Sequence, residues 1–431
     1  MPSTTGPIPC SDSKSDDTSV ALLHKTSADQ CQLHFHEKVT ANNSPHGGVH
    51  PIVSLESHHE NLALLIAKAL RQFPLHDSHH SVKQKISPVL KPDFISVTRG
   101  PGMRSSLTTG LDTAKGLAVA CQIPLVGINH MQAHALTPRL VSMLDKEAPA
   151  PKPDFPFLSL LVSGGHTLLV HSKAITNHKI LAETTDIAIG DAIDKIARHV
   201  LPPTLLKSKN EIMYGRLLEN FVFPNGASSS IDYVAPTTRA EEIVRRQTQW
   251  GWALCPPLAE TRSGEKSKAM EFTFSGLESA VRRICDAKGS EMSIEERIDL
   301  GKESMRIAFE HLASRVGWAL HDLKSTNQPI DTLVVSGGVA SNTFLKIVLR
   351  SFLAARGFHN VNLVFPPAAL CTDNAAMIAW AGMEMFERGW ESELSCRALR
   401  KWSIDASAED GGILGADCWK RRYYSGRNET K

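Results

Sequence analysis

Short apolar runs alternate with helical stripes along most of the chain. The apolar runs have strand length and are rich in β-branched and aromatic residues, which predicts buried strands. The predicted strands cover 19–23, 32–39, 94–98, 123–128, 157–162, 168–171, 332–335 and 361–365. Apolar residues at helical spacing predict helices over 62–70, 107–121, 186–198, 294–323 and 344–352, with a last helix opening after 373. This alternation of strands and helices predicts an α/β fold.

A proline-rich stretch divides these elements into two sets. Residues 149–156 contain four prolines, which predicts a hinge between two domains. With 431 residues, the chain is long enough for two domains that each bury a core. The stretch 201–270 has no regular pattern, so we interpret it as an insertion in the second domain.

Composition narrows the class of protein without deciding its function. A hydrophobic share of 42% is ordinary for a globular protein, and no apolar run approaches the roughly 20 residues needed to span a bilayer. The net charge of +2 does not by itself indicate nucleic acid, so an RNA site would have to be a local basic patch. Eight cysteines without a CxxC pair predict reduced thiols rather than a disulfide framework.

Two histidines four residues apart stand where a predicted strand passes into a helix. Asn129 follows the apolar run and can cap the helix that carries His130 and His134. Residues at i and i+4 share one helical face, so both imidazoles can point at one metal ion. Most such pairs are incidental when taken alone, so a metal site needs support from the rest of the chain. Pro138 is expected to bend or end this helix.

A strand followed by Ser–Gly–Gly occurs twice, at 163–165 and at 336–338. Glycines at a strand end let backbone N–H groups face an anion with no side chain in the way. A single copy could be a simple hairpin tip. Two copies on two α/β halves favour a clamp around a phosphate-containing ligand.

Several motifs coincide, in order, with those of one protein family. They are VTRGPG (97–102), NHMQAH (129–134), VSGGHT (162–167), GDAIDK (190–195), FTFSGL (272–277), SGGVASN (336–342) and CTDN (371–374). Together they resemble the tRNA threonylcarbamoyladenosine transferase family, historically labelled glycoprotease. Ser336 before the glycines and Cys371–Thr372 before Asp373 are closest to its bacterial and mitochondrial branch. The resemblance extends from about residue 16 to residue 402.

The resemblance implies a fold with two RNase-H-like domains of the actin/Hsp70 (ASKHA) type and an active site in the cleft between them. The implied domains are 1–150, completed by a C-terminal helix at about 374–405, and 151–373 with the insertion 201–270, followed by a tail at 406–431. The family's metal is held by two helical histidines and an aspartate, which match His130, His134 and Asp373. Asp373 could also cap the helix that it opens.

The resemblance also implies a set of substrate-binding residues. These are Ser163, Gly164, Gly165, His166 and Thr167 in the substrate loop, Asp194 and Asn342 as ligand contacts, Gly337 and Gly338 in the second turn, and Asp16, Asp17 and Ser275 as further candidates. The backbone donors of both Ser–Gly–Gly turns would hold the phosphate and carboxylate of the substrate. Cys371 stands near the implied metal, and packing is a better interpretation of it than nucleophilic catalysis.

The activity implied is transfer of a threonylcarbamoyl group from threonylcarbamoyl-AMP to the exocyclic amine of the adenosine beside the anticodon, in tRNAs that read codons starting with A. The implied cofactor is one divalent ion per subunit, zinc or iron. The implied partners are tRNA and a second copy of the chain, without a membrane. The family branch implies a mitochondrial location, with the cytoplasm as the alternative.

Three features depart from the family pattern. The family begins with an apolar strand, whereas residues 8–15 are polar and carry a proline ahead of the matching turn at 16–18. Either another segment fills that strand position or the start of the sequence is misassigned. Residues 1–19 show neither a secretory signal nor an arginine-rich presequence. The family's Pro–Gly–Gly turn after Lys195 is replaced by LPPT at 201–204. The basic and aromatic residues 419–424 could touch tRNA, although a solvated tail is the simpler interpretation.

Three other functions compete with the transferase. A metalloprotease of the zincin type needs Glu directly after its first histidine, and position 131 is Met. A catalytically impaired family member that binds nucleotide or partners would explain the altered first strand. A sugar kinase or another phosphotransferase of the same fold would consume ATP in proportion to product.

Overall fold

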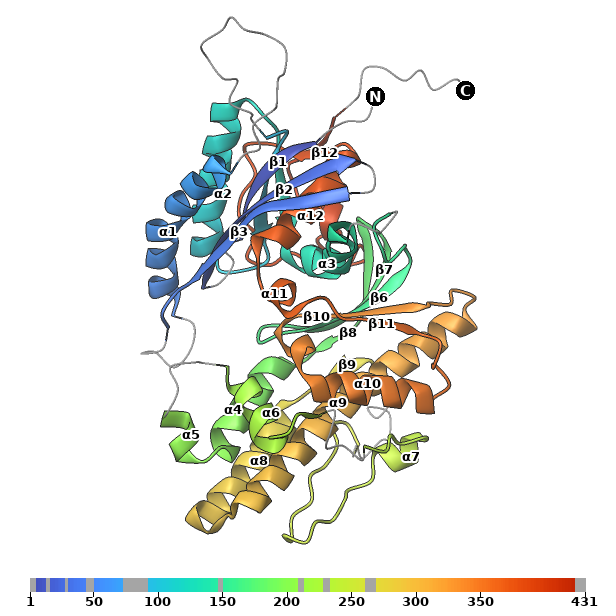
Figure 1. The fold of residues 1–431 in the computed structure, drawn as a ribbon. Coiled ribbons are helices and arrows are strands. Elements are labelled where there is room, and N and C mark those ends of the chain that lie inside the picture. Colours follow the sequence, from blue (N-terminus) through green and yellow to red (C-terminus); the bar gives the residue numbers. More distant parts are fainter. Residues whose placement is uncertain are drawn as a thin grey trace, which may run out of the picture. The chain divides into compact units, whose positions relative to one another are not determined.

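The computed structural model describes residues 5–12, 16–27, 30–43, 50–72, 92–145, 150–207, 213–227, 233–259 and 269–422 (Figure 1). The chain forms two compact units and crosses between them more than once. Unit 1 consists of Met1–Phe155, Lys173–Lys179 and Thr372–Lys431, and unit 2 consists of Pro156–Ser172 and Ile180–Cys371.

Unit 1 is built on a seven-stranded mixed sheet. In spatial order its strands are β13 (Trp419–Arg421), β12 (Trp390–Ser392), β5 (Leu125–Asn129), β4 (Ile95–Gly100), β1 (Thr5–Asp12), β2 (Asp17–Ser27) and β3 (Gln30–Thr40). The first three strands of the chain pair in antiparallel fashion, while β4 runs parallel to β1 and β5 parallel to β4. This is the strand order of an RNase-H-like sheet, extended at the β5 edge by β12 and β13.

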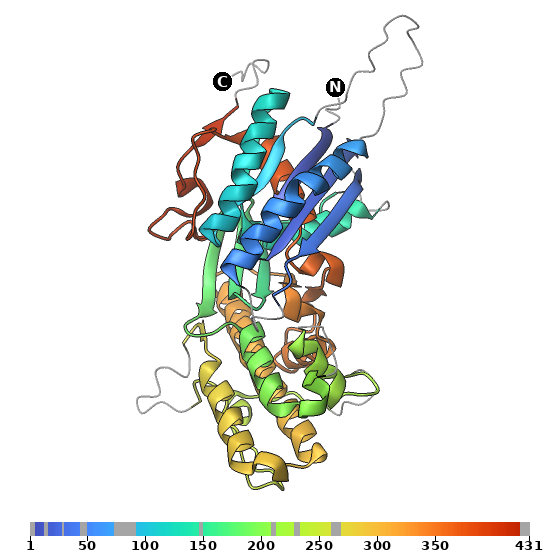
Figure 2. The same cartoon turned by 90° about the vertical axis from the view of Figure 1, so that its left-hand side faces the viewer.

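Helices cover both faces of this sheet (Figures 1 and 2). On one face lie α1 (Pro51–Arg71) and α2 (Arg104–Cys121), and on the other lie α3 (His130–Leu144) and α12 (Ala375–Glu387), which pack on each other. Because both faces are covered, the run from Val20 to Leu23 in β2 is fully buried without alternation. The short α13 (Gly412–Gly415) completes the helices described in unit 1.

The N-terminal segment occupies the central strand position, contrary to the expectation from its polar sequence. β1 pairs with β2 along its length but with β4 only at Cys10 and Ser11. Pro7 and Pro9 have no N–H to donate to a ladder, and both precede these two residues. The parallel ladder therefore begins beyond the prolines, and they do not exclude the segment from the sheet.

Unit 2 contains a six-stranded sheet with the same central order. Its strands are β11 (Asn362–Val364), β10 (Thr332–Ser336), β6 (Phe157–Val162), β7 (Thr167–Ala174), β8 (Asn177–Thr184) and β9 (Glu271–Phe272). β6 and β7 form an antiparallel hairpin, and β10 runs parallel to both β6 and β11. The order β8-β7-β6-β10-β11 repeats β3-β2-β1-β4-β5 of unit 1. Two sheets of this kind confirm the predicted α/β class with a pair of RNase-H-like domains.

The helices of unit 2 surround a large apolar core. They are α4 (Ile189–Val200), α5 (Pro203–Lys207), α6 (Tyr214–Val222), α7 (Arg239–Glu242), α8 (Ser275–Lys288), α9 (Ile294–Ser325), α10 (Thr343–Ala355) and α11 (Ala368–Cys371), with 3-10 turns at Gly289–Glu291 and Gly338–Ser341. Phe309, Leu312 and Val316 of the long α9 are completely buried. Within the described ranges, every helix is too short or too polar to span a bilayer.

Three local expectations from the sequence are wrong. Of the two alternatives at Pro138, the one in which α3 ends there is wrong, because the helix continues to Leu144 and burial of nearly the whole helix offsets the roughly 3 kcal/mol that an interior proline costs. The stretch 201–270 is not wholly irregular, since it holds α5, α6 and α7. Residues 419–421 form β13 rather than a solvated tail, while Tyr423 and Tyr424 lie outside the described residues.

Candidate metal centre and ligand cavity

The histidine pair begins a helix whose start is held by Asn129. The side-chain oxygen of Asn129 accepts hydrogen bonds from the amides of Met131 (2.9 Å) and Gln132 (3.2 Å), as the sequence predicted for an N-cap. The side-chain nitrogen of Asn129 donates to the carbonyl of Trp402 at 3.2 Å. The first turn of α3 is therefore anchored to a second segment of unit 1.

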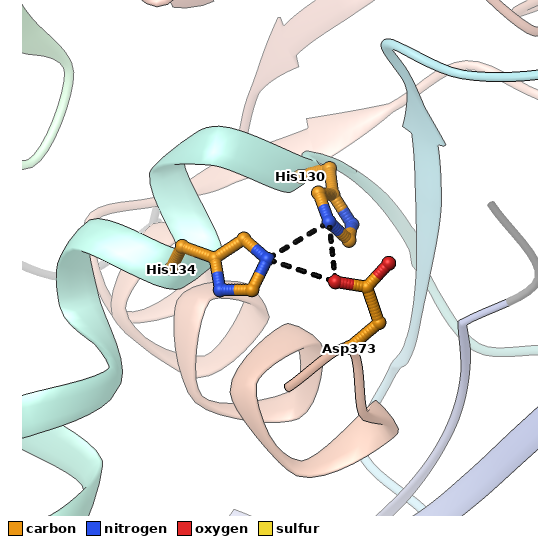
Figure 3. Close-up of side chains that lie close together, drawn as sticks. All are labelled: His130, His134 and Asp373. Carbon is orange, nitrogen blue, oxygen red and sulfur yellow. Dashed lines mark hydrogen bonds and ion pairs between the residues drawn. The ribbon is translucent and has the colours of Figure 1, made fainter. Parts of the chain in front are cut away.

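Asp373 reaches the same place from a distant part of the chain. It stands two residues before α12, and its neighbour Asn374 caps this helix by accepting a hydrogen bond from the Met377 amide at 3.0 Å. The expectation that Asp373 itself could be the cap is therefore wrong. The carboxylate of Asp373 faces the two histidines of α3 (Figure 3).

The three side chains form a small triangle within unit 1 (Figure 3). The Nε2 atom of His134 lies 3.0 Å from Nε2 of His130 and 3.1 Å from Oδ1 of Asp373. The Nε2 atom of His130 lies 3.3 Å from the same carboxylate oxygen. Both imidazoles are buried, whereas the Asp373 side chain is 24% exposed, so the triangle has one side open to solvent.

These separations fit a bound metal ion. Bonds of about 2.1 Å would place ligand atoms about 3.0 Å apart at adjacent octahedral positions and about 3.4 Å apart in a tetrahedron. The observed distances of 3.0, 3.1 and 3.3 Å fall between these limits. Two neutral imidazoles and one carboxylate leave coordination positions open, a donor set that suits zinc and iron(II) alike. The residues therefore fit a divalent ion without distinguishing these two metals.

Asp16 and Asp17 are not part of this triangle. Asp17 accepts hydrogen bonds from Lys38, at 3.0 Å, and from Thr40 on the neighbouring strand. Burial raises the pKa of Asp17, and the nearby Lys38 charge only partly opposes this effect. The Asp16 carboxylate accepts a 3.4 Å hydrogen bond from Asn43. These contacts tie both aspartates to the end of the β2–β3 pair.

The first Ser–Gly–Gly turn is the tip of the β6–β7 hairpin. The Ser163 amide donates to the carbonyl of His166 at 2.9 Å, and the Ser163 hydroxyl accepts from the amides of His166 (3.0 Å) and Gly165 (3.3 Å). The amides of Ser163 and Gly165 are therefore used inside the turn. The serine hydroxyl accepts from one of them and the turn carbonyl from the other, so binding an anion through these two amides would require them to exchange these bonds.

A cavity of about 440 Å³ lies beside this turn in unit 2. Its wall contains parts of both Ser–Gly–Gly turns together with residues of α4, α6 and α10. Its volume is in the range of about 300–1,000 Å³ that is usual for small-molecule sites. The predicted residues that line it are Gly164, Asp194, Gly338 and Asn342, whereas Ser163, Gly165, His166, Thr167 and Gly337 are not among its lining residues.

Three acceptor side chains lie in the cavity wall. Asp194 accepts a 2.9 Å hydrogen bond from the Gly215 amide, and burial raises the pKa of this aspartate. Asn342 caps α10 by accepting from the Leu345 amide at 3.0 Å. Glu219, which the sequence analysis missed, accepts from the amides of the first two residues of α10 at 2.6 and 3.2 Å. Burial also raises the pKa of Glu219.

Two glycines allow the backbone to approach closely at this cavity. Gly337 has a φ of +102°, and a Cβ atom there would lie 2.3 Å from the carbonyl oxygen of Val162. A Cβ atom at Gly190 would lie 2.7 Å from the Gly164 nitrogen and 2.7 Å from the Ser163 oxygen. The first turn therefore packs directly on the start of α4, where Thr167 also accepts the Ile189 amide at 2.9 Å.

Comparison with known proteins decides the family. A sequence model described as tRNA N6-adenosine threonylcarbamoyltransferase matches residues 34–380. The mitochondrial tRNA N6-adenosine threonylcarbamoyltransferase of Schizosaccharomyces pombe is 34% identical over 90% of this chain and 84% of its own length. The tRNA N6-adenosine threonylcarbamoyltransferase of Zymomonas mobilis is 33% identical over 85% of this chain and 83% of its own length. The chain belongs to the tRNA N6-adenosine threonylcarbamoyltransferase family.

Membership of the threonylcarbamoyltransferase family confirms the resemblance drawn from the motifs. It makes the chain a transferase that acts in tRNA modification. The mitochondrial name of the S. pombe relative agrees with the predicted branch. Neither the family nor the names of these relatives support a peptidase, a sugar kinase or an impaired member.

The segment after Lys195, where the family's Pro–Gly–Gly turn is missing, is followed by residues that line the cavity. Met213, Gly215 and Arg216 line the cavity, and the Gly215 amide is the donor to Asp194. This segment could not be found from the family motif, because Gly215 lies twenty residues beyond Lys195, outside the motif's spacing. The available signal was Gly215 in the first turn of the amphipathic helix α6.

Ser275 is the first residue of α8 and donates hydrogen bonds to Asp186. Asp186, like Glu219, was not among the candidate residues predicted from the sequence. The Asp186 carboxylate accepts hydrogen bonds from the amides of Phe274 (3.1 Å) and Ser275 (3.0 Å) and from the Ser275 hydroxyl. Burial would raise the pKa of Asp186, but these hydrogen bonds together lower it. Ser275 is therefore part of a helix start, and it is not among the residues that line the cavity.

Proposed function

We propose that this chain transfers a threonylcarbamoyl group from threonylcarbamoyl-AMP to the exocyclic amine of the adenosine beside the anticodon, in tRNAs that read codons starting with A. The observation that carries this proposal is the triangle of His130, His134 and Asp373 in a chain of the threonylcarbamoyltransferase family. The 440 Å³ cavity of unit 2 supplies a candidate site for the nucleotide part of the donor.

The reaction needs no nucleophile from the protein. The donor is a mixed anhydride, so its carbonyl carbon is already activated and AMP is the leaving group. The adenine nitrogen forms a bond to this carbon, the bond from the carbon to the phosphate oxygen breaks to release AMP, and the amine releases a proton to solvent. Because the amine lone pair is delocalised into the adenine ring, catalysis must come from positioning and from stabilising negative charge on the carbonyl and phosphate oxygens.

The side chains on the protein have separate tasks in this proposal. His130, His134 and Asp373 hold a divalent ion, zinc or iron, which when bound supplies Lewis-acid stabilisation of negative charge. Asp194 and Asn342 orient the donor from the wall of the cavity, and Gly164 and Gly338 let it approach the backbone closely. Cys371 has no role in the chemistry, because its thiol is buried in unit 2 and donates to the Pro366 carbonyl.

Partner and location follow from the family branch. The tRNA substrate is that of the family, and we propose that the chain works in mitochondria, as the name of the S. pombe relative suggests. We also propose a homodimer, which the mass of the purified protein in solution would test.

The decisive experiment compares His134→Ala with the exposed-histidine control His359→Ala. We expect the wild type and the control to bind one equivalent of metal and to modify unmodified tRNA in a single turnover. Loss of one of three ligands should remove both properties from His134→Ala. Modified adenosine at the wild-type level in His134→Ala would refute the metal role. Peptide cleavage without RNA would indicate a metalloprotease instead. ATP consumption in proportion to product would indicate a phosphotransferase.

A further inference from the structure

A buried ion pair joins α3 to α12 away from the metal ligands that these helices bring together. Arg139 on α3 donates to Glu384 on α12 twice, from Nε to Oε1 at 2.7 Å and from Nη2 to Oε2 at 3.1 Å. Their side chains are only 8% and 3% exposed. A two-pronged guanidinium–carboxylate contact fixes the distance and the orientation of its partners together.

The other nitrogen of Arg139 is also bonded. Nη1 donates to the carbonyls of Pro151 (3.0 Å) and Pro153 (2.6 Å), and the guanidinium lies 4.8 Å from the ring centroid of Phe155. These residues belong to the last stretch of unit 1 before the chain enters unit 2. Arg139 is therefore held on several sides, so the placement of its guanidinium is well determined.

The pair takes no part in the ligand triangle itself. Arg139 stands five residues after His134, about 7.5 Å farther along the helix axis. Glu384 stands eleven residues after Asp373, at the far end of α12. Any effect of the pair on the triangle must therefore act through the placement of the two helices.

The triangle depends on that placement because Asp373 moves with α12. Its neighbour Asn374 caps the helix, so a shift of α12 along its axis would carry the carboxylate with it. α12 is rich in small buried residues. Apolar contacts between two helices oppose their separation more than they oppose a shift of one helix along the other, because the hydrophobic effect has no direction. A metal site tolerates errors of only about 0.2 Å in its distances. A directional contact is needed to hold the helices in register.

We propose that Arg139 and Glu384 are positioning residues, which hold α3 and α12 in the register that the His130–His134–Asp373 site requires. This inference rests on the metal role proposed above. A buried ion pair can often be replaced by apolar residues without loss of stability, because desolvation offsets its attraction. We infer that the pair contributes alignment of the helices rather than stability.

The test is a double substitution, Arg139→Met with Glu384→Leu, in the full-length protein. It removes both charges together and leaves no unpaired buried charge, but the Pro151 and Pro153 carbonyls lose their hydrogen bonds from Arg139, so we expect a modest decrease in the melting temperature. We expect the Kd for Zn²⁺ to rise about 10- to 100-fold, as for other residues that orient metal ligands. The absorption spectrum of bound Co²⁺ should change as well, because the ligand geometry changes.

A matched control is the buried pair of α9, altered by Arg306→Met with Glu310→Leu. This pair belongs to α9 of unit 2, whereas both metal-bearing helices belong to unit 1, and we expect its replacement to leave the Zn²⁺ Kd and the Co²⁺ spectrum unchanged. Arg139→Lys keeps the charge but loses the two-pronged contact, so it should weaken Zn²⁺ binding by an intermediate factor.

The outcomes separate this inference from the proposed function. A wild-type Zn²⁺ Kd and Co²⁺ spectrum in the Arg139/Glu384 double variant would overturn the inference. If that variant fails to fold, Arg139→Lys decides, and an unchanged Kd there overturns it equally. Failure of the wild-type protein to bind either ion would refute the metal site and leave the transferase reaction to be tested separately.

Discussion

Replacing Gly190 by alanine tests how the first Ser–Gly–Gly turn is held at the cavity. Gly190 is the second residue of α4, and its amide donates to the Ser163 carbonyl at 3.2 Å. A Cβ atom there would lie 2.7 Å from the Gly164 nitrogen and from the Ser163 oxygen. Both are backbone atoms, so no flexible side chain can turn away to make room.

The size of the effect follows from these distances. Ordinary contact begins at 3.4 Å, so the turn or the helix must move by about 0.7 Å (3.4 − 2.7). Overpacking of this kind costs about 1–3 kcal/mol, and loss of the Gly190–Ser163 hydrogen bond adds about 1 kcal/mol. We expect Gly190→Ala to lower the free energy of unfolding by about 2–4 kcal/mol and the melting temperature by about 5–15 °C. Because Gly164 lines the cavity, affinity for the nucleotide should fall too.

The same substitution at Gly116 should have the opposite sign. Gly116 lies inside α2, and a Cβ atom there would meet nothing within 4 Å. Alanine is a better helix former than glycine, so Gly116→Ala should stabilise the protein by about 0.5–1 kcal/mol. Thermal unfolding and calorimetric titration with AMP measure both variants. Gly190→Ala with the melting temperature and AMP affinity of the wild type would refute the reasoning, because the close approach would then not hold the turn.

Two other side chains give further tests. Burial lowers the pKa of His178 to about 4, so below pH 6.5 the unfolded chain takes up a proton that the folded chain does not take up until about pH 4. The contribution of neutral His178 to the free energy of unfolding is fully present above pH 6.5. Between pH 6.5 and pH 4 it decreases by up to about 1.4 kcal/mol for each unit by which the pH falls. Urea midpoints should therefore depend less on pH in His178→Leu, and equal dependence would contradict this account. Burial also raises the pKa of the Cys371 thiol to about 11, so it stays protonated at neutral pH. Iodoacetamide should modify Cys371 more slowly than Cys255, and Cys371→Ala should keep the wild-type kcat; loss of transfer in a folded Cys371→Ala protein would restore the nucleophile hypothesis.

Local patterns predicted most of the secondary structure. The strand at 157–162 and the long helix starting at residue 294 agree with β6 and α9, because continuous apolar runs and helical stripes reflect burial directly. The Asn129 cap was also predictable, since an N-cap bonds only to amides two and three residues away. The insertion was less predictable, because short helices such as α7 have too few turns to show a period.

The sequence by itself determined which elements form and which residue types could bind a metal, because these depend on neighbours a few positions apart. Only the tertiary structure decided that Asp373 meets His134, which lies 239 residues earlier, and His130, and that the Gly215 amide donates to Asp194. It also decided that a proline-bearing segment fills the centre of a sheet, and that the Ser163 hydroxyl takes up an amide of its own turn. Such contacts depend on the sum of packing over a whole domain, in which a favourable total can outweigh an unfavourable local preference.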